Sequence, residues 1–328
     1  MKPIAVEPLH IAFCVNDNYV SYISVTIKSI VENNQQHDIY IHVLIDKISV
    51  TNQVRLTKAI YGYNKVNLNI HLVDNKVLAG LKTGVWTIYA WYRVLLPVIL
   101  SESVKRVLYL DADTLVMTDL QDLFSMDMTD KSIAASIDIQ SLDNRAFDRC
   151  GYEYDKQYVC SGILLMNLDY WRKNDLSNKL IDWANLNHDR IMFPDQDAIN
   201  YICRDSKIVL PLRYGILNVF FLNDAFYRGA YAAQLKDCIE QPAIIHYAGC
   251  YPWIKVFSTH LMQNEWVRYN KKLPSVCQVR TEYILKRWLY IKMMCWEILH
   301  PFYKRPKLTL NEIKYRIAGC MAESIDHN

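Results

Sequence analysis

Short apolar runs alternate with segments of helical periodicity over the first two-thirds of the chain, and this alternation constrains the fold more than any other feature. Ile23, Ile27 and Ile30 recur at the spacing of one helical face, whereas residues 66–72 alternate apolar and polar side chains as a half-buried strand does. We expect strands at residues 9–15, 39–45, 66–72, 107–110, 132–137, 162–166 and 243–246, and helices at residues 19–32, 86–96, 170–187 and 196–204. This order predicts an α/β fold with a mostly parallel central sheet.

The most informative segment is the apolar run 107–110, which ends in Asp111-Ala112-Asp113. An unbroken apolar run is typical of a strand buried on both faces, and ligands of open α/β sheets bind at the carboxyl ends of such strands. Carboxylates two residues apart share a face, and their hard oxygens suit Mg²⁺ or Mn²⁺. The alternative is a polar turn with no ligand.

His246 also follows apolar residues, at 244–245, and it precedes a segment rich in aromatic side chains. Imidazole accepts Mn²⁺ more readily than Mg²⁺, so a third ligand here favours manganese. A histidine considered alone is more often structural. Gly249 would let the backbone pass close to a ligand.

Cysteine usage indicates a reducing compartment. The chain has nine cysteines, an odd number, with no C-x-x-C pair, and the N-terminal residues lack the apolar core of a secretory signal. We expect a cytoplasmic protein with mostly buried free thiols. No apolar run approaches the ~20 residues that cross a bilayer, so no transmembrane anchor is expected.

Positive charge gathers near the C-terminus. The net charge is +3, but residues 268–316 hold twelve Lys and Arg against three Glu, so this segment is at +9 and the remainder at −6. The composition changes near residue 267. We therefore expect a catalytic domain over residues 1–267 and a basic, aromatic, mainly helical tail over residues 268–328.

The tail contains a helix pattern that favours a membrane surface. Over residues 283–299, one face carries Ile284, Trp288, Ile291, Cys295 and Ile298. Further apolar residues widen that face, and Lys286, Arg287 and Lys292 lie among them. A wide apolar face with tryptophans and basic residues suits the plane of an anionic membrane. The alternatives are a helix packed on the catalytic domain and a dimer contact.

Six pieces of the sequence, in order over about residues 9–255, resemble the bacterial members of retaining glycosyltransferase family 8. That family includes lipopolysaccharide galactosyl- and glucosyltransferases and is related to glycogenin. The pieces are residues 15–19, Tyr92-Arg93, 108–113, 161–168, 195–197 and 246–253. The resemblance implies a nucleotide-binding sandwich of the GT-A type, a UDP-sugar donor and Mn²⁺, with Mg²⁺ as the alternative ion.

The resemblance also implies roles for individual residues. Asp111, Asp113 and His246 match the metal ligands. The loop after the first strand matches the uridine-binding segment, which comprises Asn16, Asp17, Asn18 and Tyr19. Arg93 matches a basic residue near the donor, and its fork would suit a phosphate or a neighbouring carboxylate. Without the family, a surface position on a helix is an equally good interpretation of Arg93.

The resemblance also implies contacts to the donor sugar. Asp138 and Asp195 match positions that hold sugar hydroxyls, and Gln196 matches the residue closest to the reactive face of the anomeric carbon. Residues 195–197 would equally suit the first turn of a helix. The remaining donor-binding candidates are Cys160, Ser161, Gly249 and Lys255.

The chain departs from the family pattern at three places. Asn16 stands where an acidic residue is common, and Cys160 where an asparagine is common, which puts a uridine and a sugar contact in doubt. After the metal-ligating histidine the family usually reads His-x-x-Gly-x-x-Lys-Pro-Trp, and its lysine approaches the diphosphate. Here the segment is one residue shorter with Tyr251 before the proline, so Lys255 is the candidate substitute.

These observations predict a metal-dependent transferase. It would move galactose or glucose from a UDP-sugar to a glycan or lipid-linked acceptor in lipopolysaccharide or other surface-glycan synthesis. It would be peripheral on the inner face of the bacterial cytoplasmic membrane and would bind no nucleic acid. An amide is a poor nucleophile, so Gln196 favours front-face attack over a covalent intermediate.

Two alternatives remain open at this stage. The first is a catalytically inactive relative that binds nucleotide sugars or carbohydrate, which the missing lysine and Cys160 favour. The second is a nucleotidyltransferase, which would need a glycine-rich basic loop after the first strand. Residues 14–19 contain neither glycine nor a basic residue.

Overall fold

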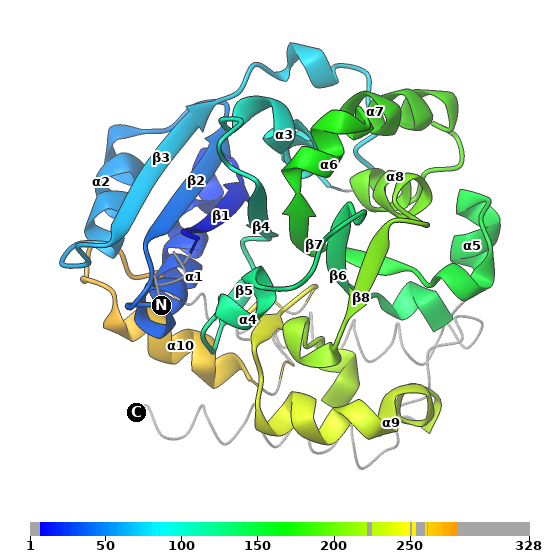
Figure 1. Ribbon diagram of the computed structural model, residues 1–328. Helices are drawn as coiled ribbons and strands as arrows, with labels where there is room; N and C mark the ends of the chain where they lie inside the picture. Colours follow the sequence, from blue (N-terminus) through cyan, green and yellow to red (C-terminus); the bar gives the residue numbers. More distant parts are fainter. Residues whose placement is uncertain are drawn as a thin grey trace, which may run out of the picture.

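The structure is a computed structural model that describes residues 7–84, 86–142, 144–221, 225–249, 251–253, 260 and 262–280. Seven strands of this part form one sheet in the order β3-β2-β1-β4-β7-β6-β8 (Figure 1). They are β1 (Leu9–Cys14), β2 (Ile39–Ile45), β3 (Val66–Leu72), β4 (Arg106–Leu110), β6 (Ile133–Ile137), β7 (Val159–Asn167) and β8 (Lys207–Leu210). β7 is antiparallel to β4 and β6, whereas the other neighbouring strands pair in parallel. The predicted α/β fold with a mostly parallel sheet is confirmed.

A second, two-stranded sheet joins two distant parts of the chain. β5 (Thr114–Val116) pairs antiparallel with β9 (Ile244–His246), and Thr114 lies opposite His246. The apolar strand expected at residues 243–246 therefore forms, but outside the central sheet. β5 follows Asp113 directly, so the pairing brings His246 next to the carboxylate turn at the end of β4.

One face of the central sheet is covered by the N-terminal helices. These are α1 (Val20–Asn33), α2 (Val50–Ala59) and the short α4 (Gln121–Phe124). Ile23, Ile27 and Ile30 of α1 pack with Leu56 of α2 against strand residues such as Ile41 in one buried cluster. The helical spacing seen in the sequence is thus the core-facing stripe of α1.

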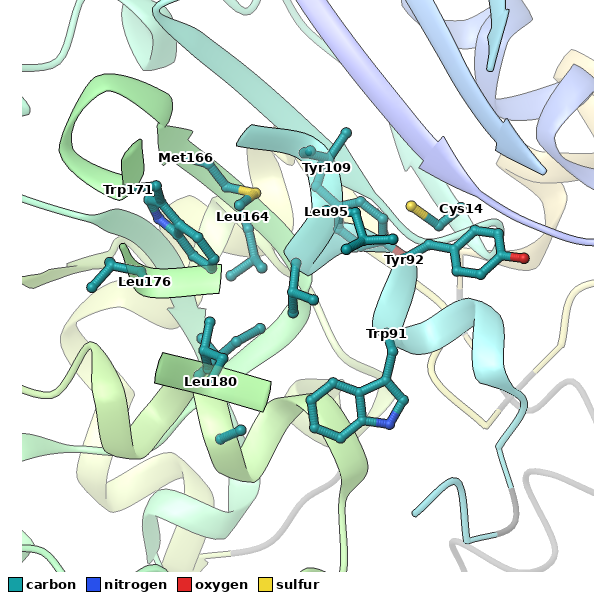
Figure 2. Packing of buried hydrophobic residues seen from close by; sticks show 14 of the residues in the cluster. Cys14, Trp91, Tyr92, Leu95, Tyr109, Leu164, Met166, Trp171, Leu176 and Leu180 are labelled. Carbon is teal, nitrogen blue, oxygen red and sulfur yellow. The ribbon is translucent and has the colours of Figure 1, made fainter. Parts of the chain in front are cut away.

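The other face is covered over β4, β7 and β6 by a second set of helices. They are the 3₁₀ helix η3 (Ile88–Leu95), α3 (Leu96–Ile99), α6 (Leu168–Lys173), α7 (Leu176–Leu186) and α8 (Pro194–Ile202). Figure 2 shows the resulting cluster, in which Tyr92 and Leu95 of η3 lie near Tyr109 of β4, and Trp171 of α6 lies by Met166 of β7. This packing holds η3 against the strand end that carries Asp111.

Two expected helices differ in detail. The helix expected at residues 86–96 is 3₁₀ from Ile88 to Leu95, and an α-helical turn then continues through Pro97. Pro97 lies at the start of that turn, where its missing N–H costs no hydrogen bond. The helix expected at residues 170–187 is two helices, because Asp175 takes a left-handed conformation with φ of 52° between them.

The remaining elements connect these layers. The 3₁₀ helices are η1 (Asp17–Tyr19), η2 (Asn75–Leu78), η4 (Ile139–Leu142), η5 (Tyr154–Lys156), η6 (Leu212–Tyr214) and η7 (Asn218–Phe221). The α-helices are α5 (Asn144–Cys150), α9 (Ala225–Glu240) and α10 (Gln263–Lys272). None of the helices in the described ranges is both long and apolar enough to cross a bilayer.

α10 runs across the domain boundary predicted at residue 267. Its Trp266 and Tyr269 pack with Val25 of α1 and Tyr247 in one buried cluster, which Cys277 also joins. The first residues of the predicted tail, as far as Arg280, thus belong to the folded body. Residues 281–328, with the predicted membrane helix at 283–299, lie outside the described residues.

Candidate active site at the end of β4

The carboxylate turn Asp111-Ala112-Asp113 lies between β4 and β5 and is fixed from both sides. The backbone N–H of Asp111 donates to the carbonyl oxygen of Gly162 at 2.8 Å, and the Thr114 hydroxyl donates to the carbonyl oxygen of Asp111 at 2.8 Å. The N–H of Tyr247 donates to the carbonyl oxygen of Asp113 at 2.9 Å. Both carboxylates are therefore held at the carboxyl end of a central strand, as the sequence predicted.

His246 completes a group of three potential metal ligands. Its Nε2 lies 3.4 Å from Oδ1 of Asp113 and 3.7 Å from Oδ2 of Asp111. One ligand atom from each of the three residues lies within 4.8 Å of the other two. In the part of the chain that the structure describes, no other cluster of three or more His, Cys, Asp or Glu side chains is placed to hold an ion. Two carboxylate oxygens and an imidazole nitrogen suit Mn²⁺, so the residues present fit a divalent cation.

Gly162 explains how the three side chains come so close. A Cβ at this position would lie 2.4 Å from Cε1 of His246 and 2.6 Å from Oδ2 of Asp111. Both distances are far shorter than a carbon contact permits. The glycine of the Ser161-Gly162 pair is thus required by the packing of the site, a reason that the sequence did not reveal.

The charges of the group are arranged for a cation. Burial disfavours the imidazolium form of His246, but Cys160 and Asp113 beside it outweigh burial and hold its pKa well above the ordinary value. Burial likewise opposes ionisation of Asp111, yet Arg93 and His246 keep the pKa of that carboxyl below its usual range. In both cases the neighbouring opposite charges decide the protonation state.

Arg93 is buried and faces carboxylates. Its Nη2 lies 3.1 Å from Oδ1 of Asp111, its Nε lies 3.2 Å from Oδ2 of Asp195, and Nη1 donates to the carbonyl oxygen of Ser161. The guanidinium also lies over the ring of Tyr109, 4.1 Å from its centroid. The alternative that Arg93 lies on a helix surface is wrong, because its side chain is buried. The guanidinium faces neighbouring carboxylates, which were one of the two kinds of partner expected for it.

Gln196 lies between Ser161 and Asp138 with its amide orientation set. Its Oε1 accepts a hydrogen bond from the backbone N–H of Ser161 at 2.9 Å. The Nε2 group therefore faces Oδ2 of Asp138 and the hydroxyl of Tyr158, each at 3.4 Å. Three residues singled out from distant parts of the sequence thus meet in one polar cluster.

Asp195 and Asp197 flank Gln196 at the start of α8 and are both buried. Burial raises the pKa of Asp195 although Arg93 opposes the shift. Asp197 receives hydrogen bonds from Arg149 at 2.9 and 3.1 Å, from the Tyr158 hydroxyl at 2.6 Å, and from two backbone N–H groups. The alternative that residues 195–197 form a helix start is also correct, since α8 begins at Pro194.

Three residues around the site were missed from the sequence. Tyr109 donates to Oδ1 of Asp111 at 2.5 Å, and Tyr158 and Arg149 anchor Asp197. Tyr109 could have been found, because it lies two residues before Asp111 on a strand and therefore on the same face. No sequence signal pointed to Tyr158 or Arg149, since α5 and β7 meet α8 only in the folded chain.

The predicted uridine-binding segment begins at η1, directly after β1. The side chain of Asn16 caps this helix by accepting from the N–H of Tyr19 at 3.2 Å. Oδ1 of Asp17 accepts from the N–H of Ser49 at 2.9 Å, which ties the loop to the start of α2. The Tyr19 ring is 39% exposed and lies edge-on to Trp253.

The segment after His246 turns back toward this loop. Gly249 has a φ of 74°, a left-handed conformation that favours glycine. Trp253 lies between Tyr22 and Tyr251, with ring centroids 3.9 Å and 5.4 Å away. Tyr251, at the position of the family lysine, thus stacks on a tryptophan, and Lys255 lies outside the described residues.

Comparison with known proteins places the whole site inside one family domain. The family described as glycosyl transferase family 8 matches residues 10–256. The chain is 25% identical over 252 residues to a lipopolysaccharide 1,2-glucosyltransferase of Escherichia coli, covering 75% of this chain and 74% of that protein. It is 26% identical over 271 residues to general stress protein A of Bacillus subtilis, covering 80% of this chain and 93% of that protein.

A solved structure shares the fold. The galactosyltransferase LgtC, crystallised in complex with donor and acceptor sugar analogues, superimposes with a TM-score of 0.72 at 24% identity. The match covers 81% of this chain and 97% of that one. At this identity the likeness supports the architecture alone.

Proposed function

The chain belongs to glycosyl transferase family 8, and from this premise we propose that it transfers a hexose, galactose or glucose, from a UDP-sugar to a glycan acceptor. Transfer would need a divalent metal ion, with Mn²⁺ preferred over Mg²⁺, and would retain the configuration of the anomeric carbon. The observation that carries the proposal is the convergence of Asp111, Asp113 and His246 beside the polar cluster of Gln196 and Asp138.

The acceptor class rests on the relatives. The Escherichia coli relative is named for glucose transfer to lipopolysaccharide, and LgtC was crystallised with a donor and an acceptor sugar analogue. We extend to this chain a nucleotide-sugar donor and a surface glycan or lipid-linked oligosaccharide as acceptor.

In this proposal Asp111, Asp113 and His246 hold the metal ion. When bound, the ion would stabilise negative charge on the departing diphosphate as a Lewis acid, without a proton transfer. Arg93 keeps the Asp111 carboxylate ionised and aimed, because its buried guanidinium bridges the partly exposed Asp111 and the buried Asp195. Asp195 thus positions Arg93, in addition to the sugar-holding role predicted from sequence.

Gln196 faces the donor sugar in this proposal. Its amide oxygen already accepts a hydrogen bond from the N–H of Ser161, which lowers further the nucleophilicity of a weak nucleophile. We therefore favour front-face attack by the acceptor within an ion pair over a covalent glycosyl intermediate. Asp138, only partly buried beside the Gln196 amide, is the carboxylate placed to accept a sugar hydroxyl.

The nucleotide would bind along η1. Asn16 and Asp17 each use one side-chain oxygen to order this loop, so the NH₂ group of Asn16, Asn18 and the exposed Tyr19 are the main uridine contacts in this proposal. Tyr19 rests against Trp253, which packs on the cluster that includes α10. An aromatic ring supported in this way is a suitable platform for a planar base.

The principal alternative is an inactive relative that binds a nucleotide sugar without transferring it. Tyr251 in place of the lysine is the observation that favours it, because a cation that would face the diphosphate is missing there. The three metal ligands and the ordered Gln196 amide favour an active enzyme. Turnover with a donor decides between the two.

The deciding experiment is a donor screen on the full chain. We expect UDP release from UDP-glucose or UDP-galactose with Mn²⁺, weaker release with Mg²⁺ and none in EDTA, with the N-acetyl donors and GDP-glucose as controls. The anomeric proton NMR signal of the product should be that of an α-linkage from an α-linked donor. Release unaffected by EDTA would contradict metal dependence, a β-product would contradict retention, and the absence of release with every donor would support the inactive relative.

We further propose that the C-terminal segment attaches the enzyme to the inner face of the cytoplasmic membrane. The support is the apolar, basic pattern at residues 283–299. Because Cys277 belongs to the folded body, the truncation is placed after Arg280. The truncated protein should bind Mn²⁺ and UDP normally but no longer sediment with phosphatidylglycerol vesicles at low salt. Full-length protein that ignores those vesicles would rule the attachment out.

A further inference from the structure

The imidazole of His246 has a different neighbour on each nitrogen. Nε2 faces the carboxylates of Asp111 and Asp113, whereas Nδ1 lies 3.6 Å from Sγ of Cys160, within hydrogen-bond range for sulfur. Both side chains are buried, with 4% of His246 and 5% of Cys160 exposed. Among the described residues, the thiol is the hydrogen-bond partner recorded for Nδ1.

Strand alternation places residue 160 on the metal side of β7. Cys160 and Gly162 are two residues apart, share one face and both lie against His246. Ser161 points to the other face, where its hydroxyl lies 3.4 Å from Oε1 of Gln196. The position that sequence assigned to a sugar contact therefore has its side chain directed at the histidine.

Cys160 does not complete the metal ligand set itself. The group whose ligand atoms lie within 4.8 Å of one another comprises Asp111, Asp113 and His246, without the thiol. Sγ of Cys160 lies instead next to Nδ1, the ring nitrogen of His246 that is directed away from the carboxylates. A histidine that binds a metal through Nε2 must carry its proton on Nδ1, and the acceptor at Nδ1 selects that tautomer.

We propose that Cys160 is a positioning residue, which accepts the Nδ1–H of His246 and so directs the Nε2 lone pair toward the metal. The inference rests on the proposed metal-dependent function and assigns the residue that replaces the family asparagine to the metal rather than to the sugar. Close packing at Gly162 fixes where the ring lies, but packing alone does not choose between the two tautomers. In this proposal Sγ of Cys160 makes that choice by accepting the Nδ1–H rather than donating its own S–H to the ring.

The test measures Mn²⁺ binding to the full chain, without nucleotide, from the EPR signal of free Mn²⁺. Cys160→Ala and Cys160→Val both remove the acceptor, and we expect the Mn²⁺ Kd to rise about tenfold in each, the lower end of the range for outer partners of metal ligands. Cys160→Ser keeps an acceptor and should stay within about threefold of the unsubstituted protein. Cys203→Ala is the matched control, because Cys203 is fully buried at the end of α8, and its Kd should not change.

The outcomes separate this inference from the proposed function. If the unsubstituted protein binds Mn²⁺ and the Ala and Val variants bind it equally well, Cys160 does not position His246. A Ser variant as weak as the Ala variant would also overturn the inference, because it would show that packing of the thiol matters and its acceptor does not. An unsubstituted protein that binds no Mn²⁺ would instead contradict the metal site itself. Two acceptor-free variants keep the test valid if one of them does not fold.

Discussion

Two histidine environments, one on β9 of the two-stranded sheet and one on β1, β2 and β3 of the central sheet, have opposite charge preferences. His246 lies at the end of β9 against two carboxylates, and these surroundings raise its pKa well above the ordinary value. His42, in the middle of β2, is similarly buried, but its pKa is lowered to about 3 by burial and by its neighbours His10 and His71. Burial alone disfavours the charged imidazole in both places. Cys160 and Asp113 beside His246 reverse the result.

The geometry of the second group shows why it is no metal site. Nδ1 of His10 lies 3.0 Å from Nε2 of His42, and Nδ1 of His42 lies 3.0 Å from Nε2 of His71. The ring centroids are 5.3 Å apart at both contacts, with the planes of His10 and His42 17° apart and those of His42 and His71 31° apart. Both nitrogens of the central His42 are directed at its neighbours, so its lone pair is used in a hydrogen bond. The histidine row formed by His10, His42 and His71 thus differs from the candidate ligand His246 in what its ring nitrogens face.

The sharpest test of this contrast compares Asp113→Ala with His42→Gln. Loss of Asp113 removes one of the two carboxylates that attract a cation, and we expect transfer to fall about a thousandfold, which corresponds to roughly 4 kcal/mol of transition-state stabilisation. His42→Gln should leave transfer within about twofold. Initial rates of UDP release at saturating donor measure both. Equal losses in the two variants would show that the histidine row also contributes to the site.

A smaller effect is expected on the sugar side of the same region. Gln196→Ala removes an amide held by Ser161 and next to Asp138, and we expect turnover to fall about tenfold through lost orientation. UDP affinity, measured by calorimetry with Mn²⁺, should remain nearly unchanged, because the amide is expected to face the sugar. Gln121→Ala, on the exposed side of α4 with Ser125, is the control. A collapse of UDP binding would place Gln196 at the nucleotide instead.

The smallest expected effect is a loss of folding stability at acid pH, caused by His10, His42 and His71. Because the pKa of His42 is lower in the folded chain than its ordinary value of 6.5, the unfolded chain binds more protons between pH 6.5 and about 3. Stability should therefore be complete above pH 6.5 and fall as the pH drops below it, by roughly 1 kcal/mol per pH unit for this proton. Burial lowers the pKa of His10 as well, and the charge of Glu7 offsets part of that shift.

Urea unfolding at pH 7.5, 6.0 and 5.0 measures that slope. His42→Gln should reduce the dependence of the free energy of unfolding on pH by the amount that corresponds to about one bound proton. His188→Gln, at an exposed position, should leave this dependence unchanged. A slope that is the same in all three proteins would show that the row does not resist protonation, and the contrast with His246 would then fail.

The periodicity of the sequence was sufficient for the fold class and for most of the central sheet. The strands at residues 39–45 and 66–72 match β2 and β3 in full. The apolar run of β2 is buried except at Tyr40, whereas β3 lies at the sheet edge and is only partly buried, with Leu72 70% exposed. The helix at residues 86–96 was less predictable. η3 is held by packing of Trp91 and Tyr92 in the core of Figure 2 rather than by local preference. Several short elements, such as β5 and α5, have no pattern long enough to be read.

The sequence by itself indicated the three candidate metal ligands, because Asp111 and Asp113 follow a buried strand and His246 follows another apolar run. It also indicated the family through six pieces in order. Only the tertiary structure decided how these residues are arranged. The pairing of β5 with β9 places His246 beside the carboxylates, and the absence of a side chain at Gly162 leaves space for both. Arg93 turned out to bind carboxylates, and Cys160 to face the histidine. The Cys160–His246 contact joins residues 86 positions apart, and a local pattern cannot specify which of many distant partners a side chain will meet.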